Sequence, residues 1–282
     1  QYVAKPAHVF VEVDLNQAEL RSLATMSRDP LLVDIYTKNE TSIHDVTTSE
    51  FYASKADVMD NEEIRHHVCR MLHLPLDTPG ALVYGEAKMR GKAVNFGIVY
   101  GRTDHSLAKE FDTSIGEASR WINKWMDTYS GAAEFIQWCR RAPAHRRDLI
   151  TVYGRHKRWG VVTNENLRNL QNEAANFPHQ STASDIMLET AILTYERLRD
   201  EWGAMVWNEV YDALYFEVEA DDRKVAESIQ FVQKVITEVP VKRGLDVVPF
   251  LGDAKVGYTW GSMVDFLPGK DTILGKLGER AH

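Results

Sequence analysis

The alternation of apolar and polar residues predicts strands near both ends of the chain. Residues 8–15 (HVFVEVDL) alternate in this way and are rich in valine, which is typical of a half-buried strand. Residues 204–222 predict two strands around a tight turn near residues 211–213, and residues 247–261 return to a strand pattern. Strand-forming segments therefore lie on either side of the middle of the chain.

The middle of the chain is predicted to be mainly helical. Apolar residues at helical spacing predict helices over 17–29, in pieces over 42–73, along a stretch from 88, over 114–142 and over 222–240. Residues 149–162 predict a hairpin with a basic tip. Residues 166–198 predict a broken helix followed by a long one, because Pro178 should end or kink the first part. The whole pattern predicts an α+β fold, one mixed domain that a helical insertion interrupts.

The helix in KMRGKAVNFGIVYGRTD (88–104) carries an unusual face. At 3.6 residues per turn, the residues on this face are two cations followed by two aromatics: Lys88, Lys92, Phe96 and Tyr100. Lysines suit phosphates, and flat aromatic rings suit a base, which stacks on them without regard to sequence. This order predicts a site for a nucleoside triphosphate; the alternative is an amphipathic core helix.

Two acids lie at the ends of predicted strands. Asp14 ends the first strand, and Asp212 lies at the predicted turn. A carboxylate beside a buried strand is costly unless it is paired or binds a metal. Taken singly, each could be a helix cap or a turn residue. Brought together, they would suit Mg²⁺, whose other ligands come from water and substrate phosphates.

Composition narrows the possible functions. The chain has 282 residues and a net charge of −8, so it is not a protein that binds nucleic acid over its whole surface. Its two cysteines make no disulfide framework or zinc site, and no apolar run is long enough for a membrane span. Basic residues nevertheless concentrate between 140 and 158, where the alternative to a binding site is a solvated surface.

Five segments in order resemble motifs of the family A DNA polymerases, the DNA polymerase I group. VDLNQAELR (13–21) is similar to the first palm motif, D-Y-S-Q-I-E-L-R, and the helix from 88 is similar to the fingers helix, R-x-x-x-K-x-x-x-F-x-x-x-Y-G. The other three are SIHDVTTSEFY (42–52), NEAANFPHQSTASDI (172–186) and EVYDALYFEV (209–218). The resemblance implies a right-hand polymerase, with palm in residues 1–30 and 160–282 and mainly helical fingers in 31–159.

The resemblance also implies roles for individual residues. Asp14, Asp212 and the carbonyl of Leu15 would hold two Mg²⁺ ions, for which Mn²⁺ can substitute, and Lys92 would act on the leaving pyrophosphate. The implied nucleotide-binding residues are Lys88, Lys92, Phe96, Tyr100, Gln17 and Glu19, the last as the gate against a 2′-hydroxyl. The implied DNA-binding residues are Asn176, Gln180, Arg155, Lys157, Arg158 and Tyr211.

The implied activity is DNA-directed DNA synthesis from dNTPs on a primer–template. Departures from the family pattern leave a non-catalytic DNA-binding subunit as an alternative: Ala213 replaces a second acid, Asn172 an arginine, Tyr211 a histidine, and Lys88 the usual arginine. A single-subunit RNA polymerase is a further alternative, which Glu19 disfavours because the RNA enzymes have a small residue there.

The resemblance further implies a partner. In the family, a thumb and part of the palm precede the first metal-binding aspartate, whereas thirteen residues precede Asp14 here. We therefore expect a fragment or one chain of a split, phage-type polymerase. A second polypeptide would then supply the thumb and N-terminal part, and the thumb would be absent from this chain. The expected location is the cytoplasm of a bacterium or of a phage-infected cell.

Overall fold

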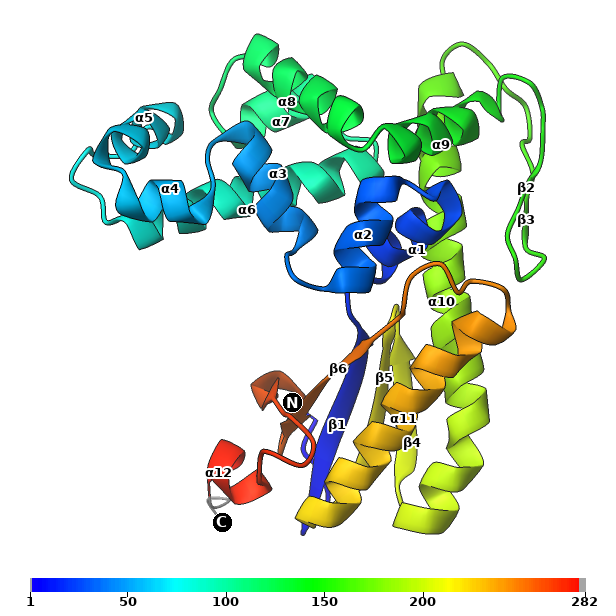
Figure 1. The fold of residues 1–282 in the computed structure, drawn as a ribbon. Helices are drawn as coiled ribbons and strands as arrows, with labels where there is room; N and C mark the ends of the chain where they lie inside the picture. The colour runs from blue at the N-terminus through cyan, green and yellow to red at the C-terminus, as the bar shows by residue number, and fades with distance from the viewer. Residues whose placement is uncertain (1, 279–282) are drawn as a thin grey trace. The chain divides into compact units, whose positions relative to one another are not determined.

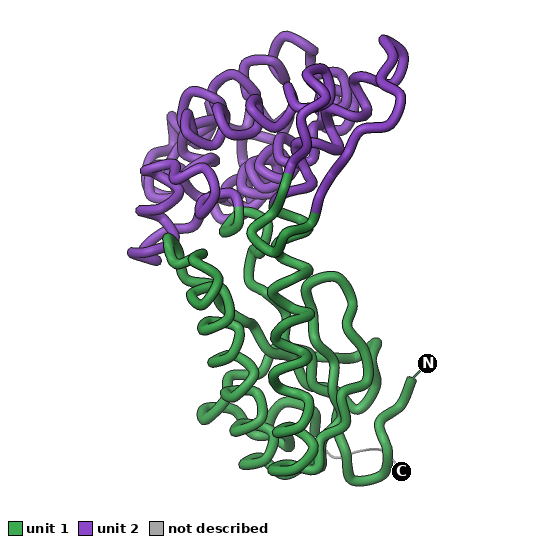
Figure 2. The backbone as a smooth tube through the Cα atoms, turned by 90° about the vertical axis from the view of Figure 1, so that its right-hand side faces the viewer, with its two compact units in different colours: residues 1–22, 150–155, 179–282 green, residues 23–149, 156–178 purple. Residues whose placement is uncertain are grey.

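The computed structural model describes residues 2–278, and the chain divides into two compact units. The first unit comprises residues 1–22, 150–155 and 179–282, and the second comprises 23–149 and 156–178 (Figure 2). Compactness alone does not say which residues belong to palm or fingers, so the boundaries at 30/31 and 159/160 stay a prediction.

The first unit is built on a five-stranded antiparallel sheet, which together with the many helices confirms the α+β fold class. The strand order is β4-β5-β1-β6-β7. The strands are β1 (His8–Leu15), β4 (Met205–Val210), β5 (Ala213–Glu219), β6 (Gly252–Gly257) and β7 (Val264–Asp265). The first predicted strand thus becomes the centre of the sheet, paired on both sides by strands from the far end of the chain.

One face of this sheet is the core of the first unit. Alternate residues of β1 are fully buried or nearly so: Val9, Val11, Val13 and Leu15. They pack in one cluster with apolar residues of α11 (Asp222–Lys242) and of the second part of α10 (Leu167–Trp202) (Figure 1). Because side chains alternate along a strand, Glu12 and Asp14 must lie on the opposite face.

The second unit is helical. Its helices are α2 (Pro30–Lys38), α3 (Ile43–Phe51), α4 (Lys55–Asp60), α5 (Glu62–Leu72), α6 (Gly80–Val99), α7 (Asp104–Glu110), α8 (Ile115–Thr128) and α9 (Ser130–Arg141). The remaining elements of the chain are α1 (Ala18–Ser27), β2 (Leu149–Ile150), β3 (His156–Lys157), the 3₁₀ turn η1 (Trp260–Ser262) and α12 (Ile273–Leu277).

A buried amide joins three helices of the second unit. The Oδ1 atom of Asn95, on α6, accepts hydrogen bonds from Thr47 Oγ1 of α3 at 2.9 Å and from Trp125 Nε1 of α8 at 2.8 Å. Its Nδ2 atom lies 3.0 Å from His44 Nδ1, also on α3. Without Asn95, Trp125 Nε1 and His44 Nδ1 would each lose the partner named here, so the network fixes which face of α6 turns inward.

Asp29 caps two helices at once. Its Oδ1 accepts from the backbone N–H groups of Leu31 and Leu32 at the start of α2, at 3.1 and 3.0 Å. Its Oδ2 accepts from Gly131 and Ala132 at the start of α9, at 2.9 and 3.3 Å. One buried carboxylate therefore satisfies four N–H groups that helix termini leave unpaired, and its charge suits both N-termini.

Three sequence-based expectations of local structure hold only in part. Helix α10 continues through Pro178, because it buries Ala174 and Ala175 before the proline and Ile186 after it. That burial outweighs the cost of a proline in a helix interior, about 3 kcal/mol.

The predicted helix over 114–142 is interrupted at Tyr129, and the last strand is short. Tyr129 has non-helical φ and ψ of −111° and 59° and is fully buried, with its hydroxyl 3.0 Å from Thr47 Oγ1. Before β6, Pro249 and Leu251 bond instead to Arg21 and Asn16 through their carbonyls, at 2.6 and 2.8 Å. Tertiary partners decide both departures from the local pattern.

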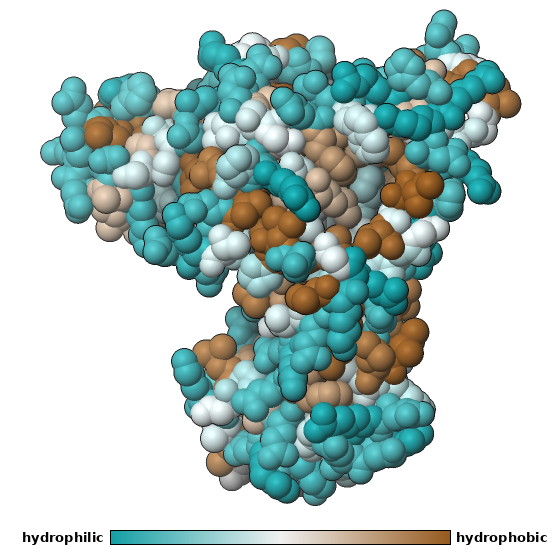
Figure 3. All heavy atoms as spheres, turned by 45° about the vertical axis from the view of Figure 1, so that its right-hand side comes forward, coloured by the Kyte–Doolittle hydropathy of each residue, from teal (hydrophilic) through white to brown (hydrophobic). Residues whose placement is uncertain are grey.

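The visible surface is mostly hydrophilic. On the face shown in Figure 3, apolar side chains form separate patches among hydrophilic ones.

Among the described residues, none of the helices combines the length and the apolar character needed to cross a membrane.

The double cap makes a stability prediction. Asp29→Ala should destabilise the chain by about 2–4 kcal/mol, since two N-caps are lost together and each is worth about 1 kcal/mol or somewhat more. Asp221→Ala is the matched control, because Asp221 caps α11 alone through Lys224 N at 2.9 Å, and should cost about 1 kcal/mol. Urea unfolding followed by circular dichroism measures both; equal losses would contradict the double role.

Candidate active site

The structure brings Asp14 and Asp212 together on the first unit. In the β1–β5 pairing Asp14 lies opposite Ala213, and the Leu15 N–H donates to the Asp212 carbonyl at 3.0 Å. The two carboxyl groups are hydrogen-bonded to each other. The antiparallel register therefore brings two acids from opposite ends of the chain into contact.

These two acids resist being ionised together. Burial raises the pKa of Asp14 from 3.8 to about 7, and the negative charges of Asp212 and Glu12 add to the effect. Burial also raises the pKa of Asp212. The pair thus retains a proton at Asp14 near neutral pH, as expected when two carboxylates share a site without a cation.

A partly buried ion pair lies beside the acids. Glu12 is two residues before Asp14 on the same face and only 8% exposed, and Lys255 Nζ lies 2.5 Å from its Oε1. Tyr215, opposite Glu12 on β5, also hydrogen-bonds to the Glu12 carboxylate. The Lys255 charge lowers the pKa of Asp14, but by less than the neighbouring Glu12 charge raises it.

A third acid lies on the other side of Asp14. In the β1–β6 pairing Asp14 lies opposite Asp253, whose Oδ2 accepts from Asn16 Nδ2 at 2.6 Å. Sequence reasoning did not single out Asp253, Glu12 or Lys255, although GDAKVG alternates in phase with the acidic face of β1. Within residues 2–278 no group of three or more His, Cys, Asp or Glu residues could hold a metal ion.

The acid pair fits Mg²⁺ as a partial ligand set. Two carboxylates that share a proton offer hard oxygens, and a divalent cation would favour their ionised form and release that proton. Mg²⁺ commonly takes only one or two protein carboxylates and completes its shell with water and substrate phosphates. The residues that could hold it here are Asp14 and Asp212, with the carbonyl of Leu15 beside them.

The residues next to the acids have strained backbones. Gln17 and Tyr211 have positive φ values, 50° and 58°, which non-glycine residues rarely adopt. Tyr211, at the tip of the β4–β5 turn, is 86% exposed. Glu19 lies at the start of α1 and is half-buried. Backbone strain of this kind tends to cluster at functional sites.

The cation–aromatic face of α6 forms as predicted within the second unit. Lys92 is exposed, and the rings of Phe96 and Tyr100 stack with centroids 6.4 Å apart and planes 22° apart. Lys88, by contrast, pairs with Asp45 at 2.7 Å, and Tyr84 donates to the same carboxylate at 2.6 Å. Lys92 is therefore the cation of this face that stays available to an anion.

His44 is a candidate that sequence reasoning missed. Its ring centroid lies 5.8 Å from that of Phe96, and its pKa is lowered to about 4 by burial and then by the charges of Lys92 and Lys88. A neutral imidazole thus lies close to the phosphate-binding candidates of α6. In the sequence, His44 lies in the SIHD segment at 42–45, part of one of the five motif-like segments, and this placement is the signal that could have identified it.

The predicted DNA-binding cations are all paired. Arg155 bonds to Asp185 through two nitrogens at 2.8 and 2.6 Å, and Lys157 meets Glu173 at 2.7 Å. Arg158 lies 3.3 Å from Asp148. On α10, Gln180 is exposed, and Asn176 Oδ1 is buried without a hydrogen-bond partner among the described residues.

Comparisons with known proteins point to one family. The model of DNA polymerase family A matches residues 76–262. The DNA polymerase I of Caldicellulosiruptor bescii is 28% identical over 263 residues, which cover 92% of this chain and 27% of the relative. That of Pseudomonas aeruginosa is 27% identical over 268 residues, which cover 92% and 25%. This chain thus spans about a quarter of the length of these relatives.

A solved structure shares the fold. The POL domain of Pol1 from M. smegmatis, solved in complex with DNA primer-template and dNTP, superposes with a TM-score of 0.70 at 21% identity. The match covers 92% of this chain and 41% of that one. This likeness confirms the predicted palm-and-fingers fold class.

The acid pair predicts a pH dependence of stability. Because the folded pKa of Asp14 is raised, its favourable contribution is complete below pH 3.8 and is lost as pH rises through about 7. Asp14→Asn should therefore be more stable than wild type at pH 8, and equal to it near pH 3.5. The difference should be about 1–2 kcal/mol, after solvent screening of a partly exposed group is discounted.

The control for this prediction is Asp246→Asn, which removes an exposed carboxylate of the same unit. Urea unfolding across the pH range measures all three proteins without added metal. If Asp14→Asn keeps the wild-type pH profile, Asp14 and Asp212 do not repel each other as described.

Proposed function

This chain belongs to the family A DNA polymerases, and from that premise we propose that it carries out template-directed DNA synthesis. In this proposal a primer 3′-hydroxyl attacks the α-phosphate of a dNTP and pyrophosphate leaves. The single observation that carries the proposal is that the β1–β5 register brings Asp14 and Asp212 together, with burial raising the pKa of both carboxyl groups.

The acids hold the metal in the proposed reaction. Asp14, Asp212 and the Leu15 carbonyl would bind two Mg²⁺ ions, or Mn²⁺ in their place. When bound, the ions supply charge stabilisation for the attacking and leaving oxygens. The protein's own contribution is to fix the two carboxylates through the β1–β5 register, so that little reorganisation is needed during the reaction.

The face of α6 would bind the incoming nucleotide. Lys92 would contact the triphosphate and give a proton to the leaving pyrophosphate, with Lys88 one turn earlier. Phe96 and Tyr100 would pack against the sugar and the bases, because their stacked rings offer flat faces. Support comes from the exposure of Lys92, whereas Lys88 would have to share or exchange its Asp45 partner to reach a phosphate.

Glu19 and Gln17 would lie beside the sugar of the nucleotide, with Glu19 excluding a 2′-hydroxyl. Asn176, Gln180 and Tyr211 would contact the primer–template. Arg155, Lys157 and Arg158 would reach backbone phosphates only by exchanging their carboxylate partners, or by using the N–H groups that those partners leave open. Their contribution to affinity should therefore be smaller than three free cations would give.

The palm and fingers ranges and a second polypeptide belong to the same proposal. Residues 1–30 and 160–282 would form palm, and 31–159 fingers. The thumb and the N-terminal part would come from a longer form of this chain or from a second polypeptide. The polypeptide encoded directly upstream is the natural candidate for the assays below.

A non-catalytic DNA-binding subunit remains the second candidate. One observation favours it: Ala213, buried and directly opposite Asp14, removes the second acid that the family motif carries at this position. Activity measurements separate it from the first candidate.

The proposed function predicts the effect of removing one metal ligand. Asp14→Asn should lower nucleotide incorporation by at least about 10³-fold, because charge stabilisation in the transition state is lost, while primer–template affinity stays within about threefold. Asp246→Asn should behave as wild type. Primer extension and fluorescence anisotropy, each with the upstream polypeptide added, measure the two quantities. Comparable incorporation by Asp14→Asn would overturn the proposal, and background activity in wild type would favour the non-catalytic subunit.

The gate predicts sugar selectivity. Glu19→Ala should reduce the preference for dNTPs over rNTPs by about 10²-fold, because the space for a 2′-hydroxyl opens. Glu196→Ala, an exposed glutamate on α10, is the control and should keep the wild-type preference. Single-nucleotide incorporation with each substrate measures the ratio. A wild-type preference for rNTPs would instead favour an RNA polymerase.

A further inference from the structure

The second unit contains a pocket that none of the proposed roles uses. Its volume is about 380 Å³, and it lies where α6 ends and α7 begins, between α8, α9 and α10. Its lining combines arginines with hydroxyl and amide groups: Arg102, Arg140, Arg168, Thr103, Ser119 and Asn172, among others. The guanidinium groups can only donate hydrogen bonds, while the hydroxyl and amide groups can donate and accept them.

The pocket carries more positive charge than it balances. Arg102 pairs with Glu110, but no carboxylate among residues 2–278 pairs with Arg140 or Arg168. The acid of the lining, Asp104, is bonded instead to Ser119 Oγ and to the His105 N–H, both at 2.8 Å. Two arginine side chains therefore line the same pocket without an ion pair to a described carboxylate, and Asp104 is the one acid of the lining.

Arg140 is held in this position by its surroundings. Gly101 has a φ of 73°, and a Cβ added there would lie 2.6 Å from Asn172 Oδ1 and 3.2 Å from Arg140 Nη2. Glycine thus allows the chain after α6 to pass close to both side chains. Arg140 Nε is buried without a hydrogen-bond partner among the described residues. Burial and the charge of Arg168 both lower the pKa of Arg140, as expected of a cation that lacks an anion.

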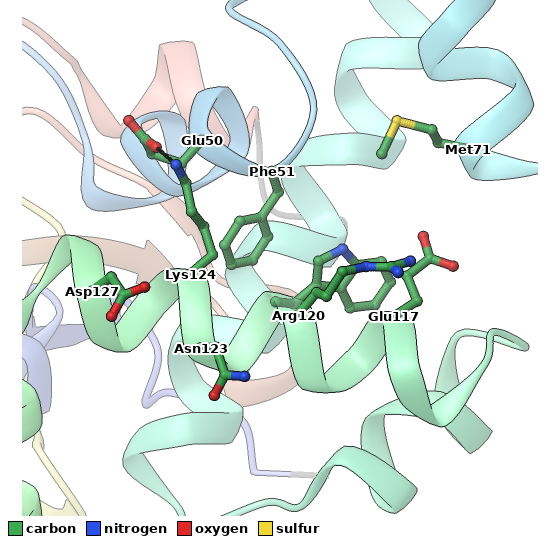
Figure 4. A pocket seen from close by; sticks show the side chains of 9 residues that line it. Glu50, Phe51, Met71, Glu117, Arg120, Asn123, Lys124 and Asp127 are labelled. Atoms are coloured by element: carbon green, nitrogen blue, oxygen red, sulfur yellow. Dashed lines mark ion pairs between the residues drawn. The ribbon is translucent and has the colours of Figure 1, made fainter.

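A neighbouring pocket of similar volume shows the contrast. It lies between α3 and α8, and Figure 4 shows Lys124 reaching Glu50, with which it pairs at 2.8 Å. Its lining contains three carboxylates (Glu50, Glu117, Asp127) and two cations (Arg120, Lys124). That pocket has more carboxylates than cations, so the excess of positive charge is a property of the pocket at Arg140 and Arg168 and not of every hollow in this unit.

We propose that the pocket at Arg140 and Arg168 binds a phosphate group of a DNA strand. The proposal rests on the proposed function for the identity of the strand and deepens it. Asn172 takes the place of an arginine in the family motif, and Arg168 lies one turn earlier on the same helix. Arg168 and Arg140 together restore, from other positions, the charge that residue 172 lacks, and arginine suits phosphate because its donors are arranged in a planar fork.

The test compares Arg168→Gln and Arg140→Gln with Arg141→Gln, an exposed neighbour that lies outside the pocket lining. Binding of a fluorescent single-stranded oligonucleotide is measured across a salt series by anisotropy, with the complete chain. Each pocket variant should reduce the slope of log affinity against log salt by about 0.7, the value for one phosphate contact to a single strand. Arg141→Gln should keep the wild-type slope.

A second arm uses inorganic phosphate as the probe, at constant ionic strength. Phosphate should raise the thermal midpoint of wild type and of Arg141→Gln, and this rise should be lost in Arg168→Gln. Loss of the phosphate effect with an unchanged DNA slope would assign the pocket to a free phosphate and overturn the DNA proposal. Unchanged behaviour in both arms would overturn the site itself.

The result of this test depends neither on the folding of Arg140→Gln nor on polymerase activity. Arg168 is exposed, so Arg168→Gln keeps the test valid if Arg140→Gln fails to fold. The slope and the thermal shift require no catalysis. A wild type that does not extend primers but shows both effects would therefore refute the polymerase proposal and leave the phosphate site standing.

Discussion

The pairing of β1 between β5 and β6 is the constraint on which the acidic site depends. Burial of Val9, Val11 and Val13 fixes the register, because a slip by one residue would place these valines in solvent and the acids in the core. Once the register is fixed, Asp14 must lie between Ala213 and Asp253, and Asp212 must lie at the adjoining turn. The apolar face of the strand thus determines the position of the polar one.

Both units keep like charges together at a cost to stability. Asp14 and Asp212 repel each other on the sheet, and Arg140 and Arg168 do so in the helical unit. A structure selected only for stability would pair or replace such groups, as it does for Glu12 with Lys255. The unbalanced pairs have opposite signs, and each suits a ligand of the opposite charge: a divalent cation at the acids and a phosphate at the arginines.

The local pattern of apolar and polar residues predicted individual strands and helices but not the contacts between them. Alternation predicted the bounds of β1, and helical spacing predicted the shared face of Lys92, Phe96 and Tyr100. The continuity of α10 through Pro178 depends on burial that no local window contains. The sequence did not indicate Asp253, His44 or the Arg140–Arg168 pair for one reason. Each becomes a candidate only through contact with a residue far away in the sequence.

In a chain with net negative charge, the cations without a carboxylate partner indicate where nucleic acid can bind better than the number of cations does. The resemblance implies that Arg155, Lys157 and Arg158 hold backbone phosphates, yet all three cations are bonded to carboxylates. A paired arginine must exchange its carboxylate for a phosphate or bind it through its remaining N–H groups, so its net gain from a phosphate is small. An unpaired arginine has no ion pair to break, so the full attraction to a phosphate favours binding. Binding at Lys92, Arg140 and Arg168 should therefore contribute more than their share of the total charge implies, although the chain as a whole carries −8.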